Sequence, residues 1–332
     1  MKIVIDSGIP FIKGVFEAYA EVVYAEGRAI SSQMVRDADV LVVRTRTRCD
    51  RELLEGSTVR LVVTATIGTD HIDLDYCSSR GIVVENAAGC NARGVLQWVA
   101  AVLVAIVAER GVSPCDLTLG IVGVGNVGSL IWEYAQRWGF RTICCDPPRE
   151  EREHLGFCSV DEIFAEADIV TLHTPLTSDT FHLVDNRLLE SWRDSDKILI
   201  NASRGEVVDT EALLCSGVEC AIDVWEYEPD INRTLLEKAF VATPHIAGYS
   251  LQGKANATAM AVAAVVRHFG LPIENWYPSE VTPSSPRAMS WEELCASIPS
   301  HYDIFAESRL LKSAPEQFEK LRNEYAYREE QF

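Results

Sequence analysis

The stretch Gly120-Ile121-Val122-Gly123-Val124-Gly125-Asn126-Val127-Gly128 decides the fold, because an apolar strand runs into a helix through three spaced glycines. Gly123 permits the tight turn, Gly125 lets the backbone approach a pyrophosphate, and Gly128 lets the helix pack against the strand. The backbone N–H groups at the start of the helix then face the negative charge of the phosphates. The stretch therefore predicts a dinucleotide site, although three glycines can also form a tight turn and nothing more.

An acidic residue follows at the distance that a dinucleotide site requires. Asp146 ends the next predicted strand and lies eighteen positions after Gly128. Its carboxylate would accept hydrogen bonds from the ribose hydroxyls and would repel a 2′-phosphate. The pattern favours NAD over NADP, while Arg149, three residues later, leaves NADP as an alternative.

Apolar strand-like runs alternate with helix-like runs over most of the chain, which indicates βαβ units and parallel sheets. The predicted strands are residues 3–5, 40–43, 61–63, 82–84, 117–122, 142–145, 169–172, 198–200 and 220–222. The predicted helices include residues 94–110, 130–138 and 253–269, and a further one that opens at Pro315 with Leu321 and Tyr325 on one face. The fold class is therefore α/β, with two doubly wound parallel-sheet domains and a small C-terminal region.

Length and charge exclude several classes of protein. At 332 residues the chain suits two or three domains, and a net charge of −19 disfavours binding to nucleic acid or to an anionic membrane. The longest uncharged apolar run, residues 94–108, is too short to span a bilayer and is predicted to be a buried helix. The chain opens without a secretion signal and its ten cysteines are scattered without a CxxC pair. We therefore expect a cytoplasmic protein with free thiols and no metal site.

Three polar side chains in the second half are expected at strand ends: Arg204, Glu228 and His245. Because ligands of open α/β sheets bind at the carboxyl ends of the strands, we expect these side chains to converge. Arg204 can hold a carboxylate through two hydrogen bonds, and His245 can exchange a proton near neutral pH. Glu228 would orient the imidazole and stabilise its protonated form. Oxidation of a 2-hydroxy acid by a nicotinamide needs this set of groups.

Each of these residues also has a simpler explanation. An arginine after a strand is often ion-paired at the surface, a lone histidine is often structural, and a glutamate before a proline is often a loop charge. Their occurrence together with the glycine motif favours the catalytic interpretation.

Five separated motifs resemble the D-2-hydroxyacid dehydrogenase family: Gly68–Asp73, Gly123–Gly128, Asn201–Gly205, Glu228-Pro229 and Pro244-His245. The resemblance implies two Rossmann-like domains. Residues 1–92 with 257–284 would form a flavodoxin-like substrate-binding domain, residues 93–256 the NAD-binding domain, and residues 285–332 a shortened C-terminal dimerisation region. It also implies that Arg204 binds the substrate carboxylate, that His245 is the acid/base and that Glu228 is its partner.

Further matches, at residues 120–128, 145–149, 173–176, 245–249, 302–304 and 318–322, are most similar to the branch of this family that oxidises 4-phospho-D-erythronate to 2-oxo-3-hydroxy-4-phosphobutanoate in vitamin B6 synthesis. This likeness implies a small phosphorylated hydroxy acid as substrate and a homodimer. The implied NAD contacts are Gly123, Gly125, Asn126, Val127, Gly128, Asp146, Thr174, Ala202, Ser203, Arg204, Asp223 and Gly248. The implied substrate contacts are Thr45, Thr66 and Tyr249.

Arg44, Arg46 and Arg48 give an independent reason to expect a phosphate. They occupy alternate positions, which on a strand would place three guanidinium groups on one face. A dianionic phosphate would suit such a patch, so Arg44 and Arg46 join the predicted substrate contacts. Ion pairing with the many carboxylates of the chain is the alternative.

Two other functions remain open at this point. The chain could be another member of the family, acting on 3-phosphoglycerate or on a different 2-oxoacid. It could also be a non-enzymatic NAD-sensing scaffold, because a fold alone does not fix a function.

Overall fold

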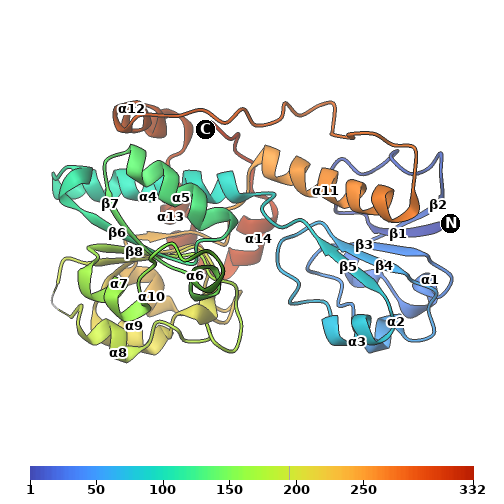
Figure 1. The fold of residues 1–332 in the computed structure, drawn as a ribbon, viewed down its shortest axis with the longest axis horizontal. Helices are drawn as coiled ribbons and strands as arrows, with labels where there is room; N and C mark the ends of the chain where they lie inside the picture. The colour runs from blue at the N-terminus through green and yellow to red at the C-terminus, as the bar shows by residue number, and fades with distance from the viewer. Residues whose placement is uncertain (194) are drawn as a thin grey trace. The chain divides into compact units, whose positions relative to one another are not determined.

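A computed structural model describes residues 1–193 and 195–332 of the chain. The chain divides into two compact units: unit 1 is Met1–Asn91 with Ser250–Pro283, and unit 2 is Ala92–Tyr249 with Ser284–Phe332. Each unit contains a parallel sheet with helices on both faces (Figure 1). The second crossing between the units lies at residue 250, and the expected separate region 285–332 packs within unit 2.

Unit 1 has a five-stranded sheet in the order β2-β1-β3-β4-β5, which is the flavodoxin-like order. Its strands are β1 (Lys2–Asp6), β2 (Glu21–Ala25), β3 (Val40–Val43), β4 (Leu61–Thr64) and β5 (Val83–Asn86), and its helices are α1 (Ser32–Val35), α2 (Arg51–Leu54), α3 (Leu74–Ser79) and α11 (Leu251–Phe269). Successive side chains of a strand point to opposite faces. Ile3 and Ile5 accordingly pack on the side of α11, and Val4 packs on the side of α1, α2 and α3.

Unit 2 has a six-stranded sheet in the order β11-β10-β9-β8-β6-β7. Its strands are β6 (Thr118–Val122), β7 (Arg141–Cys145), β8 (Ile169–Leu172), β9 (Ile198–Asn201), β10 (Glu219–Ile222) and β11 (Val241–Ala242). Its helices are α4 (Ala92–Arg110), α5 (Asn126–Arg137), α6 (Pro147–Glu153), α7 (Val160–Glu166), α8 (Asn186–Glu190), α9 (Thr210–Ser216), α10 (Arg233–Lys238), α12 (Trp291–His301), α13 (Ile304–Ser313) and α14 (Phe318–Asn323). The helices α4 and α5 cover one face, and α7 to α10 cover the other (Figure 1).

The strand order of unit 2 reverses at β6, which has β7 on one side and β8 on the other. In open α/β sheets, ligands bind outside the carboxyl ends of the strands at such a switch point. The loops that follow β6 and β8 are therefore where a cofactor should be sought.

Among the helices that the structure describes, α4 alone has the length and hydropathy of a membrane span. However, 72% of its apolar window is buried inside the protein. Leu96, Trp98 and Leu103 are fully buried and belong to the core between α4 and the sheet. The buried helix predicted for residues 94–108 is confirmed.

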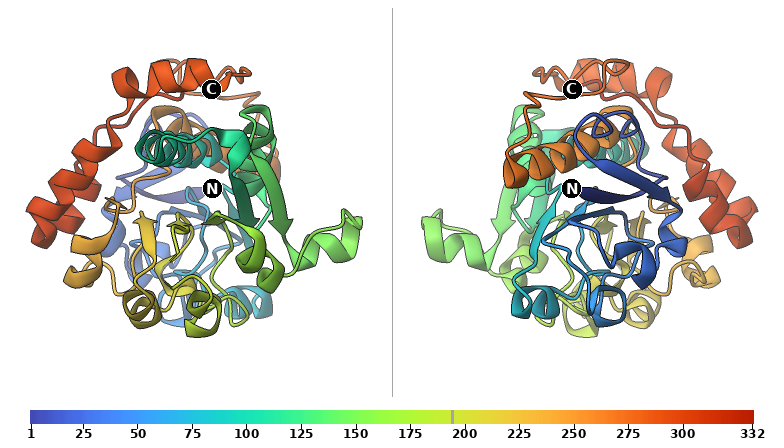
Figure 2. Two further views of the ribbon diagram at one scale, coloured as in Figure 1. Left: turned by 90° about the vertical axis from the view of Figure 1, so that its left-hand side faces the viewer. Right: turned by 90° about the vertical axis from the view of Figure 1, so that its right-hand side faces the viewer.

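The C-terminal segment folds back onto its own chain (Figure 2, orange to red). Leu294 and Phe332 join the core beside α4 and α5, while Leu311 and Phe318 join the core on the opposite side of the sheet. The helix predicted to open at Pro315 is wrong in its detail, because Pro315–Gln317 is a short 3-10 turn and α14 ends at Asn323, so Tyr325 lies beyond the helix.

Candidate active site

The glycine loop between β6 and α5 is tight where it packs and open where a phosphate would approach. Gly123 has a φ of +86°, and a Cβ there would lie 2.7 Å from the carbonyl carbon of His173. A Cβ on Gly128 would lie 2.0 Å from the carbonyl oxygen of Gly123. A Cβ on Gly125 would meet nothing within 4 Å. The loop therefore fits a dinucleotide, whose pyrophosphate needs the space that a side chain at Gly125 would fill.

Asp146 lies at the end of β7 against this loop. Its two carboxylate oxygens accept hydrogen bonds from the backbone N–H groups of Val124, at 2.8 Å, and Arg149, at 2.9 Å. The guanidinium of Arg149 donates to the carbonyl of Val124 and to the hydroxyl of Ser129, both at 2.9 Å. Asp146 and Arg149 thus hold the glycine loop together from the side where the ribose is predicted.

The two residues that follow β8 at the switch point each carry a buried polar atom without a hydrogen-bond partner among the described residues: Nδ1 of His173 and Oγ1 of Thr174. The other ring nitrogen of His173, Nε2, lies 2.8 Å from the hydroxyl of Thr171. Burial lowers the pKa of His173 to about 3, so its ring is neutral. Buried polar groups are normally hydrogen-bonded, so these two atoms are suited to a ligand such as the predicted cofactor.

The loop that carries Arg204 is closed by Asn201 at the end of β9. The Asn201 side chain accepts from the N–H and the hydroxyl of Ser203, at 3.1 and 2.8 Å, and donates to the carbonyl of Arg204 at 2.9 Å. A Cβ on Gly205 would lie 2.0 Å from the carbonyl carbon of Trp225. The loop of Ala202, Ser203 and Arg204 is therefore pressed against the backbone that leads to Glu228.

Asp223, at the end of β10, is fully buried and fixes the loop that carries His245. Its Oδ1 accepts from the hydroxyl of Thr243 at 2.6 Å and from the N–H of Ile246 at 2.8 Å, and its Oδ2 accepts from the N–H of Ala247 at 3.0 Å. Burial raises the pKa of Asp223, although the charge of His245 and these hydrogen bonds act in the opposite direction. His245 has a φ of +58°, a left-handed conformation that a non-glycine residue keeps only when its surroundings impose it.

Glu228 and His245 form a direct pair. Nδ1 of His245 lies 2.8 Å from Oε2 and 3.2 Å from Oε1 of Glu228, and the N–H of Trp225 donates to Oε1 at 2.9 Å. Burial by itself raises the pKa of Glu228, but the charge and hydrogen bond of His245 and the charge of Arg322 lower it overall. The carboxylate is therefore ionised and holds the imidazole ring by one nitrogen.

Arg322, in α14, is a site residue that the sequence analysis did not predict. Its Nε donates to the hydroxyl of Tyr249 at 3.2 Å, and its Nη1 lies 3.4 Å from Oε2 of Glu228. Tyr249, a predicted substrate contact, is thereby linked to the Glu228–His245 pair. Gly248, predicted to contact NAD, immediately precedes Tyr249 in the chain.

The predicted substrate contacts of unit 1 lie after two neighbouring strands. Thr66 follows β4, and its hydroxyl lies 2.6 Å from that of Thr64, which in turn lies 3.1 Å from Nε2 of His71. Arg44 follows β3 and donates through Nε to the buried carboxylate of Asp6 at 3.1 Å.

The predicted strand face of three arginines is wrong. The strand β3 ends at Val43, and residues 44–47 form a turn closed by a 3.2 Å hydrogen bond from the N–H of Thr47 to the carbonyl of Arg44. Arg48 is ion-paired with Asp50 at 3.0 Å. Thr45 and Arg46 stand in this turn, so the arginines do not share one strand face.

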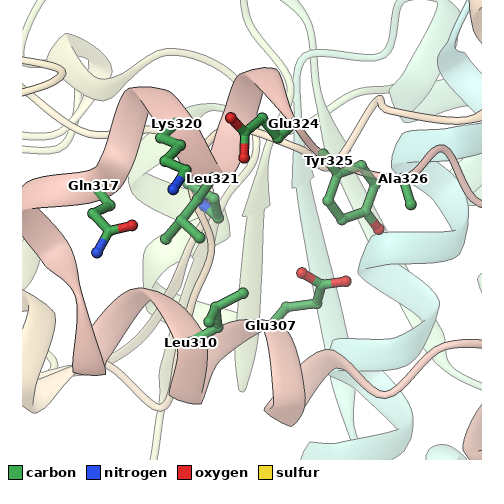
Figure 3. Close-up of a pocket in the computed structure, with 9 residues that line it drawn as sticks. Glu307, Leu310, Gln317, Lys320, Leu321, Glu324, Tyr325 and Ala326 are labelled. Atoms are coloured by element: carbon green, nitrogen blue, oxygen red, sulfur yellow. The ribbon is translucent and has the colours of Figure 1, made fainter.

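A hollow of about 400 Å³ lies in unit 2 beside α13 and α14 (Figure 3). It is lined by Pro244, Glu307, Leu310, Gln317, Lys320, Leu321, Glu324, Tyr325 and Ala326. None of the predicted site residues lines it. Two of its lining residues are chain neighbours of site residues: Pro244 precedes His245, and Leu321 precedes Arg322.

Comparisons with known proteins show the family of the chain. Residues 98–247 match the family described as D-isomer specific 2-hydroxyacid dehydrogenase, NAD binding domain. The chain is 45% identical to an erythronate-4-phosphate dehydrogenase of Bacteroides thetaiotaomicron over 100% of this chain and 97% of that protein. It is 37% identical to one of Porphyromonas gingivalis over 98% and 93% of the two chains.

Solved structures of related dehydrogenases have the same fold. An NAD⁺-bound 3-phosphoglycerate dehydrogenase of Entamoeba histolytica superimposes with a TM-score of 0.69 at 26% identity, over 82% of this chain and 96% of that one. A D-lactate dehydrogenase of Aquifex aeolicus in complex with NAD and lactic acid superimposes with a TM-score of 0.65 at 25% identity, over 86% and 100%.

Proposed function

The chain belongs to the D-isomer specific 2-hydroxyacid dehydrogenases, and from this premise we propose that it oxidises 4-phospho-D-erythronate to 2-oxo-3-hydroxy-4-phosphobutanoate with NAD. This reaction belongs to the biosynthesis of pyridoxine 5′-phosphate. The observation that carries the proposal is the hydrogen-bonded pair of Glu228 and His245 in a chain 45% identical to an erythronate-4-phosphate dehydrogenase over its full length.

The cofactor would be held by the glycine loop and its neighbours. The open face of Gly125 leaves room for the pyrophosphate, Asp146 stands where the ribose hydroxyls are expected, and Oγ1 of Thr174 needs a partner. Asp223 and Gly248 are proposed contacts for the nicotinamide end. When bound, NAD supplies the acceptor for the hydride that leaves the substrate.

His245 would take the proton from the 2-hydroxyl group. Because Glu228 engages Nδ1, the ring nitrogen positioned to accept that proton is Nε2. The ionised Glu228 then stabilises the imidazolium that results. Arg204 would bind the substrate carboxylate with its planar guanidinium and polarise the carbon that becomes a carbonyl.

The phosphate of the substrate would be bound by groups of unit 1. We assign Arg44 and Arg46 to it, with Thr45, Thr66 and Tyr249 as further proposed substrate contacts. The support is chemical: these side chains offer guanidinium and hydroxyl donors, which are the usual ligands of a phosphate dianion.

The proposal includes a homodimer in the cytoplasm, formed through the C-terminal segment. Leu310 and Phe305 of α13 are 50% and 37% exposed, so α13 offers apolar surface to a second copy of the chain. Sedimentation of the purified protein measures the oligomeric state, and a monomer at all concentrations would contradict this part.

NADH formation, followed by absorbance, tests the reaction. Purified protein receives NAD and 4-phospho-D-erythronate, 3-phosphoglycerate or D-lactate, with a 2-oxo acid added to reoxidise tightly held NADH. We expect turnover with 4-phospho-D-erythronate and a loss of rate at low pH, where the base is protonated. Preference for 3-phosphoglycerate or D-lactate would assign the chain to another member of the family. NAD binding without turnover of any substrate would favour the scaffold.

A further inference from the structure

Arg322 lies between two residues that the proposed reaction uses. It belongs to α14 of the C-terminal segment, and it meets Tyr249 through Nε at 3.2 Å and Glu228 through Nη1 at 3.4 Å. The side chains are only partly exposed, 29% for Arg322 and 18% for Glu228. Charges in such surroundings act on one another more strongly than charges in bulk water.

Glu228 therefore lies between the His245 ring and the Arg322 guanidinium. Its Oε2 is 2.8 Å from Nδ1 of His245 and 3.4 Å from Nη1 of Arg322, while its Oε1 is held by the N–H of Trp225 at 2.9 Å. With three partners on two oxygens, the carboxylate cannot rotate away from the imidazole without losing hydrogen bonds.

We propose that Arg322 is a positioning residue for the Glu228–His245 pair. Its guanidinium fixes the Glu228 carboxylate against Nδ1 of His245. Its positive charge also offsets part of the negative charge that Glu228 places beside the His245 ring. This inference rests on the proposed function and deepens it, because the base of a hydroxy-acid oxidation must be neutral before it can accept a proton. A cation beside Glu228 favours the neutral ring at a given pH.

Other charged groups act on the same residues. Asp223, at the end of β10, interacts electrostatically with both His245 and Arg322, and burial raises the pKa of Asp223. Tyr249 and Glu228 raise the pKa of Arg322, which burial alone would lower. Arg322 is thus protonated throughout the range in which a histidine titrates, and it adds a constant positive charge to the pair.

The direct test is the titration of the His245 ring, which needs no substrate. The full-length protein is labelled with ¹⁵N-histidine, and the His245 signals are assigned among seven histidines by comparison with His245→Gln. Arg322→Gln is compared with the wild type and with Lys320→Gln, which removes one charge from the exposed face of the same helix. Arg322→Met provides the same comparison if the Gln variant does not fold.

In Arg322→Gln we expect the titration midpoint of His245 to move by about half a pH unit to the alkaline side. The acidic limb of kcat/KM for oxidation should move with it. Arg322→Lys keeps the positive charge but lacks the planar guanidinium group. Its His245 midpoint should therefore lie close to that of the wild type, while its kcat stays below the wild-type value. Lys320→Gln should leave both quantities unchanged.

Two results would overturn the inference. One is an unchanged midpoint in a folded Arg322→Gln protein. The other is a raised KM for 4-phospho-D-erythronate with an unmoved acidic limb, which would make Arg322 a substrate ligand. A wild type that turns over no hydroxy acid would instead overturn the proposed function, and the titration would still report on Arg322.

Discussion

A side chain at position 125 would extend into open space, whereas a side chain at position 128, only three residues later, would clash with the backbone. We expect Gly125→Val to fold like the wild type, because a Cβ there meets nothing within 4 Å, but to lose at least about tenfold in NAD affinity. Gly128→Ala should be destabilised by about 2 kcal/mol or more, because its Cβ would lie 2.0 Å from the Gly123 oxygen. Thermal unfolding and NADH fluorescence titration measure the two effects. If Gly125→Val bound NAD as tightly as the wild type, the proposal that NAD binds at this loop would be wrong.

The charge of Glu228 has a predictable effect on the pH profile. An ionised carboxylate beside His245 favours the imidazolium, so its removal favours the neutral ring and should move the acidic limb of oxidation to lower pH. We expect Glu228→Gln to show this shift together with a kcat roughly 10² to 10⁴ below that of the wild type. Steady-state kinetics across the pH range give both quantities.

A matched control is Glu226→Gln, which changes a nearby buried carboxylate that pairs with His182 at 2.9 Å. This variant should be less stable than the wild type, but the acidic limb of its pH profile for oxidation should stay at the wild-type pH. An identical limb shift in both variants would mean that general electrostatics, rather than the pair, sets the profile.

The residues of this site differ in how far the sequence could reveal them. Gly123, Asp146 and His245 belong to short motifs whose spacing is fixed by one loop or one strand. Arg322 meets a glutamate 94 positions earlier, and nothing near it in the sequence indicates that contact. The arginines after β3 were misplaced for a similar reason, because Arg44 turns to a buried aspartate 38 positions away.

At the scale of elements, apolar runs of three to six residues identified the central strands of both sheets. Buried parallel strands read as continuous hydrophobic runs, and β3, β4, β8 and β9 are buried throughout. The strands missed were β2, a partly exposed edge strand, and β11, which has only two residues. Their formation depends on a neighbouring strand rather than on their own composition.

Arg328, a buried arginine in the tail after α14, contacts two other parts of unit 2. Arg328 donates to the carbonyls of Ile246 at 3.0 Å and Gly94 at 2.8 Å, and also to that of Ala247. Its guanidinium lies 4.5 Å from the centre of the Tyr302 ring. The contacts connect the tail to the start of α4 and to the loop that carries His245.

We expect Arg328→Met to lower the free energy of unfolding by about 2–3 kcal/mol, because buried carbonyl groups lose a charged donor. Urea denaturation measures the change. Arg309→Gln, at a 70% exposed arginine paired with Asp303, should stay within about 0.5 kcal/mol of the wild type. Equal effects of the two substitutions would contradict a structural role for the tail.

For the whole molecule, the two units differ in what the C-terminal segment contributes to them. Unit 1 is closed by α11 and ends at Pro283, whereas unit 2 needs side chains from beyond residue 284 to complete its core. Leu294 and Leu311 are fully buried there, and Met289 and Phe318 are nearly so.

Removing residues 284–332 should therefore unfold unit 2. Four large apolar side chains contribute about 1.5–3 kcal/mol each on burial, a sum comparable with the whole stability of a typical domain. We expect the shortened chain to bind no NAD and to be digested rapidly between residues 92 and 249. A shortened chain with a wild-type melting temperature and NAD affinity would show that the segment is dispensable for the fold.

The late position of Arg322 and Arg328 in the chain also orders events during protein synthesis. Both arginines follow Glu228, His245 and the strands of both sheets in the chain, so a ribosome adds them later. Domains of a nascent chain generally begin to fold from the N-terminal side. Unit 1, which ends at Pro283, can thus fold while translation continues, whereas unit 2 completes its core, and the Glu228–His245 pair gains Arg322, only after residues 284–332 have been added. Chains that end early through premature termination before residue 322 would lack this arginine.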